Sequence, residues 1–236
     1  MRYGLGRKPS PPDSRDYRLR DYMPATWPDF AHDMAFYSTG PILNQGSTPH
    51  CVGFSAAHWL NSEPVINDCD DEDGHELYYL CKVLDGEPGA ENGSWVRSAA
   101  KVLKNRGRID TYAFSDSVLE ARRFILTASP VVFGIDWYEG MFYPDADAVI
   151  RPTGELCGGH AILAYGADPD YCHFVNSWSD KWGDRGRCSM KWADLEAVFA
   201  NGGEAMAAVE TEHGFIPSPA PWWVRLWRWF LSIIKS

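Results

Sequence analysis

Residues 44–62 read NQGSTPHCVGFSAAHWLNS, and this stretch predicts a helix that begins at a cysteine. Apolar residues recur at three- and four-residue spacing from Cys51 to Ser62, and no proline interrupts them. A cysteine at the start of a helix lies at the positive end of the helix dipole, which favours thiolate over thiol. Gln45 lies upstream across a glycine turn, so its amide could fold back beside the sulfur. Together with the backbone N–H of Cys51, that amide would form an oxyanion hole.

Two later segments offer partners for this cysteine. The first, GGHAILAYG at 158–166, places His160 after two glycines, which let a substrate backbone approach closely, and before an apolar strand. The second begins at Asn176, at the end of the next predicted strand. If these strands pair, the amide oxygen of Asn176 would accept a ring N–H from His160 and fix its orientation. Trp178 could then cover that bond and exclude water.

These segments together resemble the active-site regions of papain-like cysteine peptidases, of the prokaryotic or viral type. The segments NQGSTPHCVGFS at 44–55, GGHAILAYG at 158–166 and NSWSDKWGDRG at 176–186 are similar to the cysteine, histidine and asparagine segments of that family, in the same order. The segment ENGSW at 91–95 resembles the segment that hydrogen-bonds an extended substrate. The resemblance covers roughly residues 24–210 and implies substrate binding by the residues Gly93, Ser94, Gly159 and Trp178.

The resemblance also implies a fold and a mechanism. The fold would be α+β with two lobes, one helical and one an antiparallel, β-barrel-like lobe, with the active site in the cleft between them. Cys51 and His160 would exist as thiolate and imidazolium, with Asn176 and Gln45 as the other catalytic residues. The reaction would be hydrolysis of a peptide bond through a thioester, with no cofactor and no metal ion.

Departures from the family pattern concern the surroundings of the site. Thr48 stands where the family often has a disulfide-bonded cysteine, which fits a reducing compartment. Val52 stands where an aromatic residue is usual after the nucleophile. The stretch from Cys51 to His160 is shorter than in the papain group, which indicates trimmed loops around the outer subsites.

Composition narrows the class of protein further. The 236 residues carry a net charge of −10, which argues against nucleic acid as a partner, and are 45% hydrophobic, enough for a folded core. The N-terminus lacks the apolar run of a secretory signal, so we expect a cytoplasmic protein. Most of the six cysteines are expected to be free thiols.

Periodicity divides the chain into four parts. Residues 1–30 are expected to form an extended arm over the surface, too short to contain a helical inhibitory pro-segment like those of the family. Residues 31–128 are expected to form the helical lobe and residues 129–214 the β lobe. Within them, helices are predicted at 51–62, 76–84, 94–106 and 117–127, and strands at 131–136, 161–165, 173–177, 187–191 and 205–209. Residues 68–74 are interpreted as a solvated acidic loop.

Residues 215–236 combine a proline-rich spacer with an amphipathic tail. Residues 222–236 read WWVRLWRWFLSIIKS, in which basic residues share one helical face and tryptophan, phenylalanine and isoleucine residues cover the rest. A helix of this length is too short to span a bilayer. A membrane surface, a partner protein and the surface of this chain itself are the alternative places for the tail to bind.

The sequence leaves three functional hypotheses open. The first is a cysteine endopeptidase acting on proteins or peptides. The second is a Cys–His amidase, deamidase or transglutaminase-like enzyme acting on other amides. The third is a non-catalytic interaction module that uses the tryptophan-rich tail.

Overall fold

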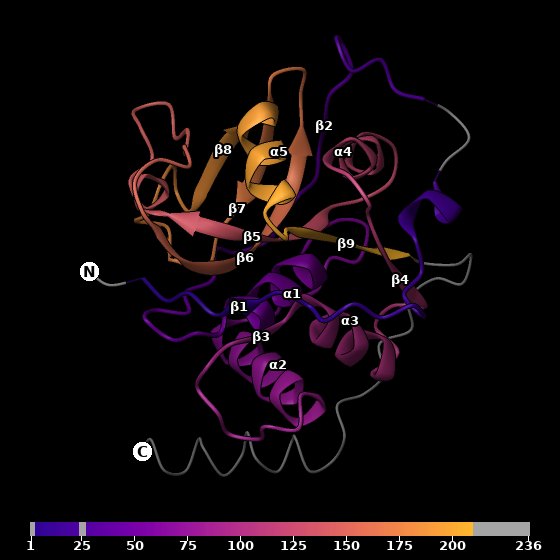
Figure 1. Ribbon diagram of the computed structural model, residues 1–236, viewed down its shortest axis with the longest axis vertical. Coiled ribbons are helices and arrows are strands. Elements are labelled where there is room, and N and C mark those ends of the chain that lie inside the picture. The colour runs from indigo at the N-terminus through magenta and orange to yellow at the C-terminus, as the bar shows by residue number, and fades with distance from the viewer. Residues whose placement is uncertain (1–2, 24–26, 210–236) are drawn as a thin grey trace.

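A large antiparallel sheet forms the centre of the molecule in the computed structural model, which describes residues 3–23 and 27–209. The strands follow the order β4-β9-β5-β6-β7-β8, and β2 pairs with β6 off this path (Figure 1). Their bounds are β2 Ala35–Phe36, β4 Thr111–Phe114, β5 Val131–Tyr138, β6 Leu156–Ala167, β7 Tyr171–Val175, β8 Arg187–Lys191 and β9 Glu204–Val209.

Helices cover the two faces of this sheet. One face packs against α1 and α3, and α2 packs behind α1 and α3; the other face packs against α4 and α5 (Figure 1). The bounds are α1 Cys51–Asn61, α2 Asp71–Leu84, α3 Val96–Asn105, α4 Val118–Thr127 and α5 Trp192–Ala200, with short 3-10 helices η1 Leu19–Tyr22 and η2 Glu139–Phe142.

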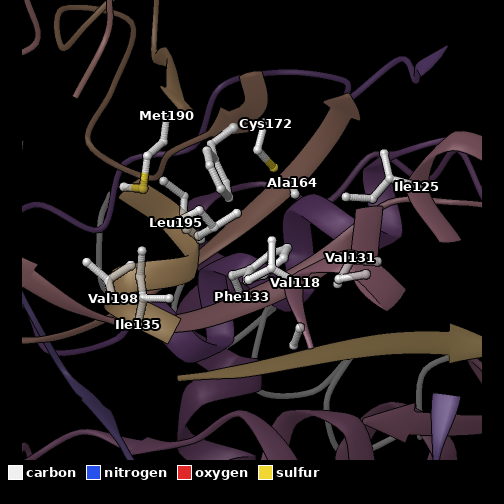
Figure 2. Packing of buried hydrophobic residues seen from close by; sticks show 14 of the residues in the cluster. Val118, Ile125, Val131, Phe133, Ile135, Ala164, Cys172, Met190, Leu195 and Val198 are labelled. Atoms are coloured by element: carbon white, nitrogen blue, oxygen red, sulfur yellow. The ribbon is translucent and has the colours of Figure 1, made fainter. Parts of the chain in front are cut away.

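The alternation of side chains along β5 explains the two cores. Val131, Phe133 and Ile135 point into the cluster with α4 and α5, which Figure 2 shows, whereas Val132 points into the cluster with α1 and α3. Successive side chains of a strand face opposite sides of a sheet, so a strand buried on both faces reads as a continuous apolar run.

The predicted α+β architecture is confirmed, and the sheet is open rather than closed into a barrel. The predicted strand at 187–191 agrees with β8, and the other predicted strands are each extended or shifted by a few residues. The short strands β1 (Arg7–Lys8), β2, β3 (Ser94–Trp95) and β4 and the helix α5 were not predicted. β4 is apolar but only four residues long, so it gave little periodic signal.

The prediction of a solvated acidic loop at residues 68–74 is wrong from Asp71 onward, because α2 begins there. Asp70 caps the helix by accepting a hydrogen bond from the Asp73 backbone, and the Asp73 side chain accepts from the Asp70 backbone. Acidic residues in the first turn also suit the positive end of the helix dipole. At α3, by contrast, Ser94 provides no cap, because its hydroxyl donates to the carboxylate of Asp85.

The buried His58 is expected to make the free energy of unfolding depend on pH. It is 1% exposed on α1, and burial lowers its pKa from 6.5 to about 3. Because the unfolded chain binds this proton more readily, stability is lost as pH falls from about 6.5 toward about 3. We expect that His58→Met reduces the loss of unfolding free energy between about pH 7.5 and pH 5 by roughly 2 kcal/mol.

Urea denaturation at the two pH values measures this difference. His32→Met is the matched control, since His32 is exposed and its contact with Asp29 raises its pKa instead. An identical loss of stability in His58→Met and in the unchanged chain would show that His58 is not the source.

Candidate active site

Cys51 is the first residue of α1 and is fully buried. Its position leaves its backbone N–H without a partner inside the helix, so this N–H is available to a ligand oxygen. The sulfur lies against the backbone of Ala161, the residue that follows His160 on β6, and against the backbone of Gly6. Helix α1 and strand β6 therefore bring the cysteine and histidine segments together.

His160 is held by the asparagine that the sequence assigns to it. Asn176 follows β7 directly, and β7 pairs with β6, so the Oδ1 of Asn176 lies 2.8 Å from the Nε2 of His160. The imidazole ring is enclosed by Trp178 at 4.6 Å and Trp137 at 4.8 Å between centroids. The other ring nitrogen, Nδ1, is buried and has no hydrogen-bond partner among the described residues. Because Nε2 is engaged, Nδ1 is the nitrogen free to exchange a proton with a thiol.

Burial sets the protonation of the pair. It raises the pKa of the Cys51 thiol to about 11, a rise that the nearby backbone groups of Ala161 and Gly6 oppose. It also lowers the pKa of His160 to about 4, against the effect of the hydrogen bond to Asn176. Both shifts favour the neutral thiol and the neutral imidazole over the thiolate and imidazolium that the sequence led us to expect. Exclusion of water from both side chains is the physical reason.

Gln45, the expected oxyanion donor, is buried, and its amide N–H groups donate to backbone carbonyls of the chain itself. Its Nε2 donates to the carbonyl of Gly4 at 3.2 Å and to the carbonyl of Thr48 at 2.7 Å. Its Oε1 accepts a 2.6 Å hydrogen bond from the hydroxyl of Ser177, so the amide has a fixed orientation. The indole N–H of Trp178 donates to the same Gly4 carbonyl at 3.3 Å.

The segment from Gly4 to Lys8 of the N-terminal arm therefore lies in the candidate site. The N–H of Gly6 donates to the carbonyl of Gly159, and the carbonyl of Gly6 accepts from the N–H of Ser94. Strand β1, Arg7–Lys8, then pairs in parallel with β3, Ser94–Trp95 (Figure 1). The two predicted substrate-binding residues Gly159 and Ser94 thus already bind a peptide, which belongs to the chain itself.

The arm runs opposite to the direction expected of a peptide substrate. In the mechanism that the resemblance implies, His160 would protonate the leaving amine, so the leaving half of a substrate would lie toward Trp178, which packs on the imidazole. The acyl half then lies along Ser94, and the substrate runs from Ser94 toward Trp178. The arm instead runs from Gly4, at Trp178, to Arg7, at Ser94. An arm bound backwards does not present a carbonyl for productive attack.

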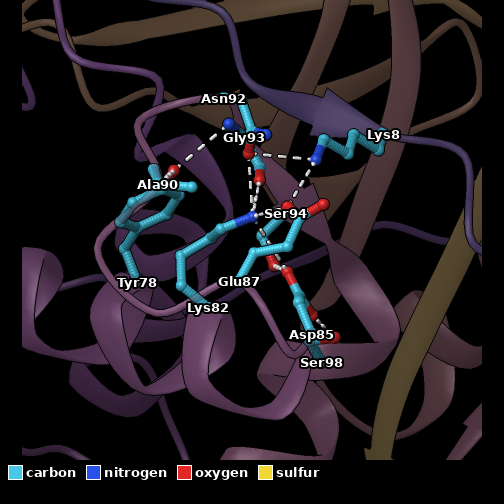
Figure 3. Close-up of polar contacts among 10 residues, drawn as sticks. All are labelled: Lys8, Tyr78, Lys82, Asp85, Glu87, Ala90, Asn92, Gly93, Ser94 and Ser98. Atoms are coloured by element: carbon cyan, nitrogen blue, oxygen red, sulfur yellow. Dashed lines mark hydrogen bonds and ion pairs between the residues drawn. The ribbon is translucent and has the colours of Figure 1, made fainter.

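A buried lysine holds the segment that contains Gly93. Lys82 is fully buried, and its ammonium donates to the carbonyl of Gly93 at 2.9 Å, to Asn92 at 2.8 Å and to Glu87 at 2.6 Å, as Figure 3 shows. The carboxylate of Asp85, also buried, lies 3.5 Å from the ammonium. These bonds fix the turn that presents Ser94 to a bound peptide.

Replacing Lys82 by methionine is expected to lower the free energy of unfolding by about 3–5 kcal/mol, because Asp85 would remain buried without its cation. Urea denaturation measures the loss. Lys181→Met is the control, since Lys181 is exposed. An equal, small effect of both substitutions would contradict this role of Lys82.

Several important residues were missed by sequence reasoning. Lys82, Asp85 and Arg7 carry no motif, and a lysine in a helix is ordinarily solvated. The three-residue spacing of Lys82 and Asp85, which allows an ion pair along a helix, was the one available signal.

An exposed cysteine, the length of the helices and the C-terminal tail complete the account. Cys157 is exposed and lines a surface pocket of about 540 Å³ with Glu139 and Tyr143. None of the helices in residues 3–23 and 27–209 is long and apolar enough to cross a membrane. The tryptophan-rich tail, 222–236, lies outside the described residues.

Comparison with known proteins agrees with this geometry. No protein-family model matches the chain. The cathepsin B-like cysteine proteinase 3 of Ostertagia ostertagi is 32% identical over 92 residues, which are 37% of this chain and 52% of that protein. The cathepsin B-like cysteine proteinase 4 of Caenorhabditis elegans is 32% identical over 79 residues, 32% of this chain and 24% of that protein. The chain thus spans about half of the first relative and about a quarter of the second.

Solved structures extend the likeness to nearly the whole fold. Xylellain, a cysteine protease from Xylella fastidiosa, superposes with a TM-score of 0.66 at 16% identity, covering 89% of this chain and 97% of that one. The Carica candamarcensis cysteine protease CMS1MS2, solved in complex with E-64, gives a TM-score of 0.53 at 18% identity, covering 73% of this chain and 93% of that one. The papain-like two-lobe fold and the resemblance to papain-like cysteine peptidases are confirmed.

Proposed function

We propose that this papain-like chain is a cysteine endopeptidase that hydrolyses peptide bonds in proteins or peptides. The observation that carries the proposal is the His160–Asn176 hydrogen bond, which leaves the second ring nitrogen of His160 buried and unpaired on the strand that contacts Cys51. A buried, oriented imidazole on a strand that meets a cysteine at a helix start suits the activation of a thiol nucleophile.

The reaction follows from these positions. His160 takes the thiol proton, and the Cys51 sulfur attacks the substrate carbonyl. The oxygen of the tetrahedral intermediate accepts hydrogen bonds from the Nε2 of Gln45, where the Gly4 carbonyl now lies, and from the backbone N–H of Cys51. His160 then protonates the leaving amine, and water, deprotonated by His160, hydrolyses the thioester. Gly159 and Ser94 align the substrate backbone, as they align the arm.

The arm must leave before a substrate can bind in this way, because one peptide cannot share these hydrogen bonds with another. The relatives named cysteine proteinases and the neighbour solved with E-64 support a thiol-dependent site that accepts peptide-like ligands.

Digestion of an unstructured protein by the full chain, analysed by mass spectrometry, tests the proposal. We expect internal cleavage by the unchanged chain and none by Cys51→Ala. A small amide substrate that is hydrolysed while the protein stays intact would indicate an amidase instead. Absence of both activities, even after displacement of the arm, would leave a non-catalytic interaction module.

A further inference from the structure

Three titratable side chains form a hydrogen-bonded row that begins at the residue before the candidate nucleophile. His50 is 1% exposed. Its Nε2 lies 2.6 Å from a carboxylate oxygen of Glu91, and its Nδ1 lies 2.6 Å from the Nδ1 of His75. Both nitrogens of a buried imidazole are therefore engaged, although none of the three side chains takes part in the proposed reaction.

His50 connects two backbone segments that the reaction needs. Its carbonyl accepts the first hydrogen bonds of α1, from the N–H groups three and four residues later at 2.9 and 3.1 Å, so its place fixes that of the Cys51 N–H. Glu91 begins the segment 91–95, in which Ser94 already binds a peptide backbone. The contact between His50 and Glu91 thus ties the backbone donor for the oxyanion to the segment that aligns a substrate.

Tyr78 of α2 holds both of these segments. Its ring stacks on the imidazole of His50, with centroids 3.7 Å apart and planes inclined by 17°. Its hydroxyl donates to the carbonyl of Ala90 at 2.8 Å and accepts from the N–H of Gly93 at 3.1 Å (Figure 3). The backbone is therefore fixed on both sides of Glu91, and the imidazole cannot leave the stack without disturbing this packing.

The hydrogen bonds limit the number of protons that the two rings can carry. A carboxylate only accepts, so the Nε2 of His50 carries a proton, and the two facing Nδ1 atoms share one proton between them. Two neutral rings satisfy these bonds, and so does one charged ring in either place. With both rings charged, two N–H groups would face each other, and the bond between His50 and His75 would be lost.

Neighbouring groups determine the pH at which the second charge is added. The groups that face His50 are Glu91, His75, the phenols of Tyr78 and Tyr79 and the thiol of the adjacent Cys51, and the carboxylates that act on His75 are Asp71, Glu91 and Glu72. Burial lowers the pKa of both histidines from 6.5, and the carboxylates oppose this shift. Both rings are therefore neutral at neutral pH, and the second charge is added only in acid.

We propose that His50 is a positioning residue for Cys51, and that it holds this residue in place only while no more than one of the rings of His50 and His75 is charged. The inference rests on the proposed function, which gives the Cys51 N–H its role at the oxyanion. At neutral pH the bonds to Glu91 and His75 hold the start of α1 against the segment that aligns a substrate. In acid the second proton separates the rings, the start of α1 shifts, and the oxyanion loses a correctly placed donor.

Nuclear magnetic resonance of the full chain tests the shared proton without requiring catalysis. The chain is labelled with 15N and carries Cys51→Ala, to prevent self-digestion. At about pH 7.5 we expect His50 to be protonated on Nε2 and His75 on Nδ1, with ring signals assigned from variants that lack one histidine. Toward about pH 4, the backbone amide signal at position 51 should shift together with the later of the two ring titrations. Rings that titrate independently, or an amide signal that does not follow them, would overturn the proposal.

The pH dependence of peptide hydrolysis gives a second measurement, with each kcat/KM divided by the value of the same chain at about pH 7.5. In His75→Gln, the new amide can donate to a neutral His50 or accept from a charged one. This variant should therefore retain about fivefold or more of the relative activity of the unchanged chain at about pH 4.5. Glu91→Gln leaves an acceptor for Nε2 but removes a charge that raises both pKa values, so its activity should be lost at a lower pH.

His173→Gln is the matched control, because His173 also contacts a carboxylate, that of Asp168, but lies on β7 away from the site. Its relative pH profile should match that of the unchanged chain. An identical profile for His75→Gln would overturn the proposal. If no chain hydrolyses any peptide, the proposed function fails, and the resonance titration still decides whether the two rings control the start of α1. Melting temperatures verify that each variant is folded.

Discussion

A chain carrying Gly6→Val is expected to react at Cys51 with an epoxysuccinyl thiol trap at least about tenfold faster than the unchanged chain. A Cβ at Gly6 would lie 2.0 Å from the carbonyl oxygen of Pro49, which is backbone and cannot rotate away. Valine therefore excludes the arm from its closed position. The reaction rate follows the fraction of molecules in which the site is open, and this fraction increases when the closed state is destabilised.

The measurement is the rate of covalent labelling, with the labelled residue identified by mass spectrometry. Pro12→Ala is the control within the same arm, because Pro12 is exposed and the site contacts end before it. Cys51→Ala should remove the label altogether. An unchanged rate in Gly6→Val would mean that the arm opens freely and does not limit access to the sulfur.

Replacement of His160 by glutamine should lower kcat/KM for peptide hydrolysis by about 10³-fold or more, because the proton acceptor and donor is lost. The comparison is made in the Gly6→Val chain, where access to the site is not limiting. Glutamine keeps a polar side chain of similar length that can still meet Asn176, so the fold is expected to persist.

His173→Gln provides the matched control for this effect. His173 also makes a polar contact, 2.7 Å from Asp168, but lies on β7 away from the site. Its substitution should leave kcat/KM within about threefold of the parent. Comparable losses in the two variants would indicate general destabilisation rather than a role of His160 in proton transfer.

The sequence was informative wherever a local pattern and a chemical requirement coincided. Cys51 begins a helix because an apolar period starts there, and His160 and Asn176 end up adjacent because their strands are consecutive and antiparallel. The strands from β5 onward were recognisable as apolar runs between turn residues, although their ends shifted by a few positions.

The rest depended on contacts between residues distant in sequence. Arg7 meets Glu204 across almost the whole chain, and no periodicity in the arm indicates such a partner. Strand β1 consists of two residues, too few for any pattern, and it forms because Ser94 offers it an edge. The burial that raises the pKa of the Cys51 thiol likewise depends on segments distant in sequence, which local sequence does not reveal.

The complete burial of Cys51 has a consequence for the chemical lifetime of the protein. Oxidants such as peroxide attack the thiolate, so a protonated sulfur shielded from solvent reacts with them slowly. While its own N-terminal residues cover it, the molecule keeps its reactive sulfur in the reduced form. The segment that keeps substrates out thereby also preserves the group that would act on them, and exposure to damage begins only when the arm departs.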